Sequence, residues 1–498
     1  MTHSRSLRAR ALMALLLMVG FYGFSLAIAG GLLWIPYYEL TELDRVHARL
    51  WLFCIVGGGS ILWAIVPRVD KFEPPGPRLT PANAPYLFII IEQVAKSTSQ
   101  RRPDEVYLLA DVNAFVTHRG GVMGLGSKRV MGVGLPLLKG LSPAELRSVI
   151  AHEFGHFVSG DVALGPWIYK TRAAIFRALD HVGHMWILAK MFELYGRMFM
   201  KMTMQVSREQ EFVADATAAR VAGVSAAMSA LKRVEVIAPA YTSFYQNEVV
   251  PVFRAGYLPP IHDGFERYLA DPDMSKLFTD YAKKNALGAE TGEYDSHPPT
   301  AERVAAIARL NFKVGEYPRD KTAVMLKDPD RHVRSLVEYI YGKENVAQLK
   351  SIKWEEVGSK VYAAMWQSMV DEHAKWLGTL TADRIPPDKN WFIKKGAELA
   401  RQHDRPDATP PDHIEYTKHT LLCAIGAALI RNGWTIETAP GRPLNVVHGD
   451  RHFEPHLAIA RLADESMKAD EWKATCDSLG LTAVPLASAA ETTRSKIA

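Results

Sequence analysis

The sequence predicts a mainly α protein of the α+β class. We expect an N-terminal transmembrane hairpin, a central helical domain with a small edge sheet, and a C-terminal, mainly helical accessory domain. Three observations predict this order: two charge-free apolar runs near the N-terminus, a proline-rich stretch after them, and helix start and stop signals in the remainder. The chain has 498 residues, 48% of them apolar, which is enough for two or three domains with buried cores.

The two apolar runs predict membrane-spanning helices. Residues 11–34 contain no charged side chain and can cross a bilayer, and residues 50–66 form a second, shorter run. We therefore assign residues 1–70 to a transmembrane hairpin. Lys and Arg residues flank the hairpin on both outer sides slightly more than they occupy its loop. This bias favours a multi-pass protein of the cell membrane, such as a bacterial inner membrane, with the large C-terminal part in the cytoplasm.

A cleaved signal peptide is the alternative to the first span. Ala27-Ile28-Ala29 resembles a cleavage site, and cleavage there would export the rest of the chain. The apolar run continues past this site and a second run follows, which favours the hairpin.

Prolines mark the passage from the hairpin to the globular part. Six of them lie between Pro67 and Pro85 and predict a stiff, extended spacer. We assign residues 71–104 to this linker and the start of the next domain, residues 105–315 to the central domain, and residues 316–498 to the accessory domain.

The stretch "HEFGH" predicts a metal-binding helix. Ser142 to Glu145 form a capping box with a proline at the first helical position, so a helix begins there. His152 and His156 lie one turn apart on one face and can hold one ion together. Glu153 can reach a water on that ion, which zinc brings to a pKa of about 7. Two histidines on an ordinary helix remain the alternative until a third ligand is found.

A second helix offers that ligand. Residues 207–223 form a helical pattern that ends at Gly223, and Glu211 and Asp215 share one of its faces. Two histidines and a glutamate are a known catalytic zinc set, and Asp215 can orient a ligating histidine. An exposed acidic face is the alternative interpretation of this pair.

Three ordered motifs, "HEFGH", "SREQEFVAD" and "SHPPTAERV", together with "VNAFV" and Asp161, resemble peptidase family M48. These are membrane-associated zinc metallopeptidases, such as the bacterial protease HtpX and the CAAX prenyl proteases. The resemblance covers roughly residues 105–310. It implies a gluzincin-type helical metallopeptidase domain with one zinc ion per chain.

The resemblance also implies roles for individual residues. His152, His156 and Glu211 match the zinc ligands, Glu153 the general base, and Asp215 the aspartate beside the ligands. His297 and Arg303 match the catalytic H-P-x-x-x-x-R element, whose histidine helps to stabilise the tetrahedral intermediate. A histidine that only orders its loop is the alternative for His297.

A predicted strand lies beside the zinc cleft. Asn113, Ala114 and Phe115 match the family's edge strand, which holds a substrate peptide by main-chain bonding. Residues 118–129 are glycine-rich but lack the lysine and the helix of a phosphate loop, so we expect a mobile hairpin that flanks the cleft.

Residues 187–202 depart from the resemblance. HtpX-like proteins have two further membrane spans at this point, whereas the stretch here is charged and amphipathic. We expect its apolar face to consist of Ile187, Met191, Leu194, Tyr195, Met198 and Met202. The favoured interpretation is a helical hairpin that packs on the protease core, and the alternative is a helix on the membrane or on client proteins.

We predict a membrane-anchored zinc endopeptidase whose partners are protein or peptide substrates and membrane lipid. A net charge of +5 without a basic patch argues against nucleic acid. The alternative is a non-catalytic, zinc-stabilised scaffold that binds clients. A second metal site at His448, His452, Glu454 and His456 is less favoured than a solvated loop.

Overall fold

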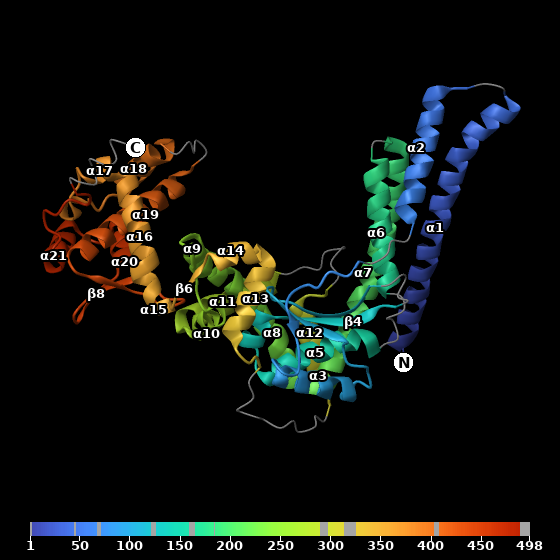
Figure 1. Cartoon of the computed structure of the whole chain (residues 1–498), viewed down its shortest axis with the longest axis horizontal. Coiled ribbons are helices and arrows are strands. Elements are labelled where there is room, and N and C mark those ends of the chain that lie inside the picture. Colours follow the sequence, from blue (N-terminus) through green and yellow to red (C-terminus); the bar gives the residue numbers. More distant parts are fainter. Residues whose placement is uncertain are drawn as a thin grey trace. The chain divides into compact units, whose positions relative to one another are not determined.

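The computed structural model divides the chain into two compact units (Figure 1). The first consists of Met1–Pro239 and Phe278–Ile340, and the second of Ala240–Leu277 and Tyr341–Ala498. The described residues are 2–43, 46–66, 71–120, 126–158, 165–183, 185–288, 297–312, 325–402 and 408–488. The structure is mainly helical with a small sheet, which confirms the α+β class.

Two apolar helices open the first unit. α1 (Thr2–Glu42) and α2 (Ala48–Ile65) are each long and apolar enough to cross a membrane. They approach closely at Gly58, where a Cβ atom would lie 3.1 Å from the Ala29 carbonyl oxygen. α1 continues well beyond the predicted end at residue 34. Its last turns are held by Glu39, which accepts a 2.9 Å hydrogen bond from the Trp51 indole of α2.

A four-stranded sheet with the order β1-β2-β4-β3 lies in the same unit. β2 and β4 are parallel, and β3 pairs antiparallel with β4, which leaves β3 at the edge. The strands are β1 (Arg78–Leu79), β2 (Glu105–Leu109), β3 (Ala114–Arg119) and β4 (Lys128–Gly134). β3 and β4 confirm a hairpin at residues 118–129, although residues 121–125 lie outside the described part.

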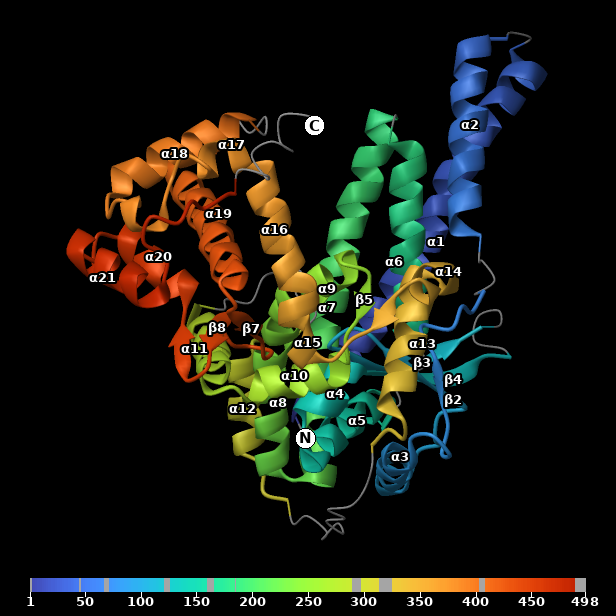
Figure 2. The same ribbon diagram turned by 60° about the vertical axis from the view of Figure 1, so that its left-hand side comes forward.

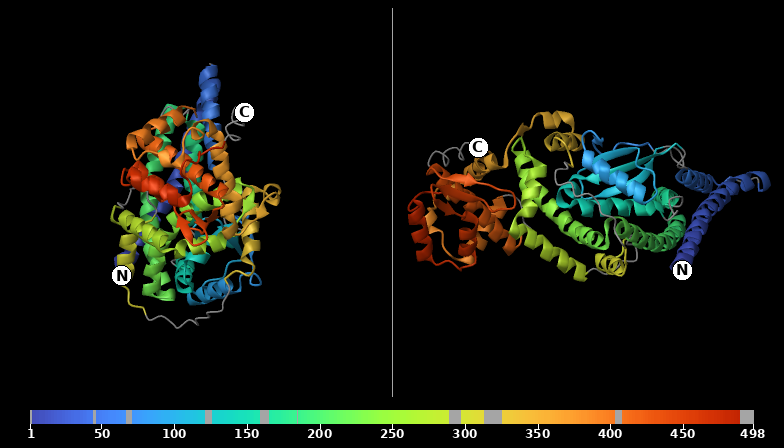
Figure 3. Two further views of the ribbon diagram at one scale, coloured as in Figure 1. Left: turned by 90° about the vertical axis from the view of Figure 1, so that its left-hand side faces the viewer. Right: turned by 90° about the horizontal axis from the view of Figure 1, so that it is seen from below.

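Helix α3 (Pro85–Ser97) and strand β1 occupy much of the predicted linker. Six apolar side chains of α3 are buried, and both α3 and β3 contact α5 (Pro143–Val158), as the right-hand view of Figure 3 allows the reader to follow. The helix α3 begins where the predicted proline spacer ends at Pro85, within the range 71–104 that was assigned to the linker and the start of the next domain.

The central helices carry the site. They are α4 (Leu135–Gly140), α5, α6 (Gly165–Val182), α7 (Trp186–Ala222), α8 (Val224–Phe244), α11 (Pro272–Gly288), α12 (Thr300–Ala308) and α13 (Pro329–Tyr341). The predicted helix that ends at Gly223 is part of α7, a single helix of 37 residues that also contains residues 187–202. α7 thus joins the amphipathic segment rigidly to the glutamate helix.

The amphipathic half of α7 packs differently from the prediction. α6 and α7 form a helical hairpin, but this hairpin packs on α1 and α2 (Figure 1). Its buried face contains Leu188, Phe192 and Phe199, whereas Ile187 and Leu194 of the predicted face are 64% and 71% exposed. Apolar side chains occupy two adjacent stripes of this helix, so periodicity alone could not identify the stripe that packs.

The second unit, Ala240–Leu277 and Tyr341–Ala498, is mainly helical, and an accessory domain over residues 316–498 stays a prediction. Figure 2 shows α19, which contacts both α16 and α18. Trp366, Trp434 and Trp472 are buried in the apolar core of this unit. Its helices are α9 (Val250–Arg254), α10 (Ile261–Ala270), α14 (Lys343–Ala347), α15 (Trp354–Val357), α16 (Ala363–Glu372), α17 (Ala374–Leu377), α18 (Lys389–Gln402), α19 (Pro410–Arg431), α20 (Pro455–Ala463) and α21 (Ala469–Leu479). Its strands are β5 (Tyr257–Leu258), β6 (Lys350–Ser351), β7 (Thr435–Glu437), β8 (Asn445–His448) and β9 (Arg451–Phe453).

Candidate metal centre

The helix α5 begins where the sequence predicts. The Ser142 amide donates to Glu145 Oε2 over 2.8 Å, and the Glu145 amide donates back to Ser142 Oγ over 3.4 Å, which confirms the capping box. Leu146, Ile150 and Phe154 are fully buried on one face of α5. Because these side chains fix the rotation of the helix, the histidines one turn apart face the opposite side.

A glycine allows α5 and α7 to touch. A Cβ atom at Gly155 would lie 2.7 Å from the Ala214 Cα atom and 3.1 Å from the Ala214 carbonyl oxygen, both on α7. Only the absence of a side chain permits this approach. Sequence reasoning missed this role of Gly155, although a glycine between two histidines on a helix was a visible signal. The close contact brings Glu211 of α7 to the histidines of α5.

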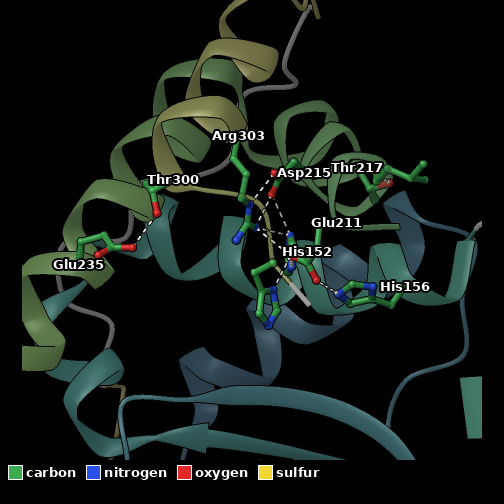
Figure 4. A network of polar contacts seen from close by, with 10 residues as sticks. His152, His156, Glu211, Asp215, Thr217, Glu235, Thr300 and Arg303 are labelled. Carbon is green, nitrogen blue, oxygen red and sulfur yellow. Dashed lines mark hydrogen bonds and ion pairs between the residues drawn. The ribbon is translucent and has the colours of Figure 1, made fainter. Parts of the chain in front are cut away.

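Three ligand atoms converge between these two helices (Figure 4). His152 Nε2 lies 3.5 Å from Glu211 Oε2, and His156 Nε2 lies 3.6 Å from Glu211 Oε1. One atom from each residue lies within 4.8 Å of the others. Among the described residues this is the only group of three or more His, Cys, Asp or Glu side chains with such spacing. The predicted ligands His152, His156 and Glu211 are therefore brought together.

The donor set fits a zinc ion. Two imidazole nitrogens and one carboxylate are ligands that zinc accepts in catalytic sites. Glu211 Oε2 is buried and accepts no hydrogen bond of regular geometry, although His297 Nδ1 lies 3.0 Å away. Arg303 Nη2 also lies 3.3 Å from this oxygen, so its positive charge offsets part of the cost of burying the carboxylate. The residues present thus suit a divalent cation on their open side.

Asp215 and Arg303 support the ligands from behind. His152 Nδ1 lies 3.0 Å from Asp215 Oδ1, which leaves Nε2 directed at the centre. Arg303 of α12 donates two parallel hydrogen bonds to Asp215, from Nε over 2.8 Å and from Nη2 over 2.7 Å (Figure 4). The Arg303 side chain is 12% exposed and lines the cavity, and its Nη2 also lies 3.3 Å from Glu211 Oε2, so it contacts both Asp215 and Glu211.

The charges of the cluster are strongly perturbed. Burial opposes the imidazolium of His152, but its contacts with the carboxylates of Asp215 and Glu211 raise its pKa to about 9. Burial and the neighbouring His152 lower the pKa of His156 to about 4. Burial would raise the pKa of Glu211, but its contacts with His152 and His297 hold it well below the usual range. A metal ion at this site would have to displace the proton on His152, so its affinity should rise with pH.

Glu153 and His297 border the same cavity as the ligands. The cavity has a volume of ≈ 240 Å³, and its wall includes Glu153, His297 and the ligand carboxylate of Glu211. Burial is the main cause that raises the pKa of Glu153 to about 7. A carboxyl group with this pKa can accept and return a proton near neutral pH. His297 is 65% exposed on its side chain and so remains open to a substrate.

The sheet edge forms another wall of the cavity. Asn113 and Ala114 line it, and the Asn113 carbonyl accepts a 2.8 Å hydrogen bond from the Gly134 amide. Phe115 does not line the cavity, because its ring lies over Gly132 of β4. Its position in the edge strand β3 is nevertheless as predicted.

Two polar residues of the cavity were missed from the sequence. Thr300 Oγ1 of α12 donates to Glu235 Oε1 of α8 over 2.6 Å, and both residues line the cavity. No spacing signal connects them, because 65 residues separate them. Asp161, which matched the family motif, lies outside the described residues.

Comparisons with known proteins agree with this geometry. Residues 81–311 match the family model for peptidase family M48. The chain is similar to the protease HtpX of Ectopseudomonas mendocina, with 26% identity over 305 residues that cover 55% of this chain and 92% of that protein. It is also similar to the protease HtpX of Pseudomonas putida, with 25% identity over 296 residues that cover 54% of this chain and 88% of that protein. No solved structure matches the chain.

Proposed function

Residues 81–311 belong to peptidase family M48, which makes the chain a membrane-associated metalloprotease, and from this premise we propose that it is a zinc-dependent endopeptidase. The convergence of His152, His156 and Glu211 beside the carboxyl group of Glu153 carries this proposal. A purely structural zinc site has no use for a general base in the wall of an open cavity.

The residues of the site divide the work of peptide hydrolysis. When bound, zinc supplies Lewis-acid chemistry that polarises the scissile carbonyl and lowers the pKa of water. Glu153 takes the proton of the attacking water and passes it to the leaving amine. His297 donates a hydrogen bond to the negative charge that develops on the carbonyl oxygen. Asp215 and Arg303 keep His152 in its ligating orientation.

The substrate is an extended segment of a protein or peptide. The edge strand β3 borders the cavity and has one side free of strand partners in the sheet. Main-chain bonding of a substrate to this edge, from Asn113 onward, would hold the scissile bond at the metal centre. The family resemblance supports a role in the quality control of membrane or misfolded proteins.

The proposed location is the bacterial inner membrane, crossed by α1 and α2. Both helices are apolar over the length that a bilayer requires. The slight excess of Lys and Arg outside their loop favours a cytoplasmic catalytic domain. Export after cleavage at Ala29 is the competing topology, and the intact mass of the purified protein distinguishes the two.

Metal content and casein cleavage, measured side by side on detergent-purified protein, test the function. Glu153→Gln should retain one zinc per chain and lose turnover by about 10²- to 10⁴-fold, the usual contribution of a general base. Glu92→Gln, an exposed carboxylate on α3, should leave both unchanged. Equal cleavage by Glu153→Gln would refute the mechanism. Zinc in all variants with cleavage in none would favour the non-catalytic scaffold.

A further inference from the structure

The hairpin of α6 and α7 shares a core with the two apolar helices. α6 contacts α2, and α7 contacts α1, as Figures 1 and 2 also show. Phe21 of α1, Ile61 of α2, Ile175 of α6, and Phe192 and Phe199 of α7 belong to one buried apolar cluster. Individual contacts therefore show how far the hairpin extends along α1 and α2.

The turn of this hairpin lies level with the middle of α2. A Cβ atom at Gly57 would lie 3.0 Å from Met185 Sδ, and Gly57 is the tenth of the 18 residues of α2. Near the C-terminal end of α2, Arg177 of α6 donates to the Ala64 carbonyl of α2 from Nε over 3.1 Å and from Nη2 over 2.9 Å. This cation caps the C-terminal end of α2. The turn thus reaches about eight residues, or about 12 Å, past that end.

The charges of α7 place the membrane boundary at the same level. Glu193 pairs with Lys190 over 3.4 Å and also with Arg197. Glu193 follows Met185 by eight residues, which is again about 12 Å of helix. Tyr195, in the next half turn, donates from its hydroxyl to the Leu17 carbonyl over 2.5 Å. Charged and tyrosine side chains at this level are typical of a membrane–water interface.

α7 exposes apolar side chains between the turn and this boundary, and also Leu194 and Met198 next to and beyond Glu193. Trp186 is 78% exposed, Ile187 64% and Met191 41%. The sequence from Val182 to Ala189 contains no Asp, Glu, Lys or Arg. Lys190 lies nearer the boundary than the turn, and its long side chain can extend to the headgroups. On α6, Asp180 is exposed and lies three residues, or about 4.5 Å, nearer the turn than Arg177, so its carboxylate has to reach back toward the headgroups.

We propose that α6 and α7 form a re-entrant hairpin that enters one leaflet by about 12 Å, contacts lipid acyl chains with Trp186, Ile187 and Met191, and does not cross the membrane. This inference rests on the proposed spans of α1 and α2. The turn is compatible with this depth because Met185 packs on Gly57 and its amide donates to the Val182 carbonyl over 2.8 Å.

The hairpin also fixes the metal centre relative to the bilayer. α7 continues without a break from Trp186 to Ala222 and carries the ligand Glu211. Glu211 lies 18 residues beyond Glu193, at most about 27 Å from the boundary. The scissile bond of a substrate therefore lies outside the hydrocarbon region, in a loop or terminus that projects from the membrane.

Thiol labelling of the full chain in sealed membrane vesicles tests the depth. One cysteine at a time replaces Ile187, Lys201 or Leu43, all exposed in the structure, while Cys54, Cys423 and Cys476 are buried. A charged maleimide is added to one side of the membrane. Lys201→Cys should react from the side of the catalytic domain, and Leu43→Cys only from the opposite side. From either side, Ile187→Cys should react at least about tenfold more slowly than Lys201→Cys, because a thiol in an apolar environment stays protonated. Addition of detergent should remove this difference.

Each other outcome overturns the proposal in a distinct way. Reaction of Ile187→Cys from the domain side would place the apolar stripe in water, where a client protein could bind it. Reaction from the opposite side would show a hairpin that crosses the membrane. Reaction of Leu43→Cys from the domain side would refute the spans of α1 and α2 themselves. None of these readouts depends on peptidase activity, so a failure of the proposed function remains distinguishable.

A cross-link tests the level of the turn independently. Gly57→Cys combined with Met185→Cys should be joined by a short bifunctional thiol reagent, since Met185 Sδ lies 3.0 Å from the Cβ position of Gly57. Gly57→Cys combined with Ile187→Cys is the matched control, because Ile187 points away from the buried face. Absence of the first cross-link, or equal formation of both, would refute the position of the hairpin turn beside Gly57.

Discussion

Of two histidine-rich stretches in this chain, one brings its imidazoles together with a buried carboxylate, and in the other the imidazoles lie apart. In the first unit, His152 and His156 of α5 meet the carboxylate of Glu211 from α7 within 4.8 Å. In the second unit, His448 and His452 lie on the hairpin of β8 and β9, and both are exposed. Each has a neighbour of its own. His448 Nδ1 lies 3.1 Å from an Arg451 nitrogen, and His452 Nδ1 lies 3.2 Å from the Asn445 amide.

The difference shows what a metal site needs beyond histidine content. Two histidines four residues apart on a helix lie on the same face. On a β-hairpin, side chains from successive cross-strand pairs lie on opposite faces. The register pairs Val447 with His452 and His448 with Arg451, so the two histidines of the hairpin diverge. Only the first cluster also has a buried carboxylate that a cation can neutralise. Local geometry and a buried acid from a second element together separate the two clusters.

Removal of one histidine from each cluster gives the largest expected contrast. His156→Ala should lose the bound zinc and all peptidase activity, because two protein ligands seldom hold zinc at a catalytic site. His452→Ala should keep one zinc per chain and full activity. Elemental analysis with casein cleavage measures both. Loss of zinc from His452→Ala, or retention of zinc in His156→Ala, would contradict the proposal that only the first cluster binds zinc.

Asp215→Asn tests the support behind the first cluster. The amide can no longer hold the Nδ1 proton of His152 as a carboxylate does, and we expect zinc affinity to fall by about 10- to 100-fold. Competition with a zinc chelator measures this affinity. Asn445→Ala, the equivalent change beside His452, should have no effect. Unchanged affinity in Asp215→Asn would mean that the buried aspartate does not orient the ligand.

Gly155→Ala tests the close contact that joins the two elements of the site. The added methyl group would lie 2.7 Å from the α7 backbone, and overpacking of this kind costs about 1–3 kcal/mol of unfolding free energy. A lower thermal midpoint and weaker zinc binding are expected together. Gly59→Ala, in a helix with no atom within 4 Å of the new methyl group, is the control. A Gly155→Ala protein as stable as this control would contradict the packing argument.

Arg303→Lys should give the smallest effect of the four. Lysine keeps the charge but loses one of the two parallel hydrogen bonds to Asp215, a loss of about 0.5–1.5 kcal/mol, or up to about tenfold in zinc affinity. Because Arg303 contacts Asp215 and the proposed ligand Glu211, zinc affinity should change while KM for casein stays constant. A raised KM with unchanged zinc affinity would instead place Arg303 in contact with the substrate.

Several structural features were recoverable from local patterns, and others were not. The capping box at Ser142 and the glycine stop at Gly223 mark real helix ends, since these signals act within a few residues. The packed stripe of α7 was misjudged, because two apolar stripes are present and only the contact with α1 and α2 selects one. The position of α3 within the first unit was likewise obscured by the prolines before it.

The sequence by itself predicted the candidate metal ligands and the proposed base, Glu153, beside them. His152, Glu153 and His156 are fixed relative to one another by helix geometry, which depends only on backbone hydrogen bonds of nearest turns. The tertiary structure decided that Glu211 and Arg303, far along the chain, reach the same point, and that α7 extends from the metal centre to α1 and α2. This convergence depends on which helix surfaces pack against each other, including the contact at Gly155. Packing between segments far apart in the chain produces no periodic pattern in the sequence.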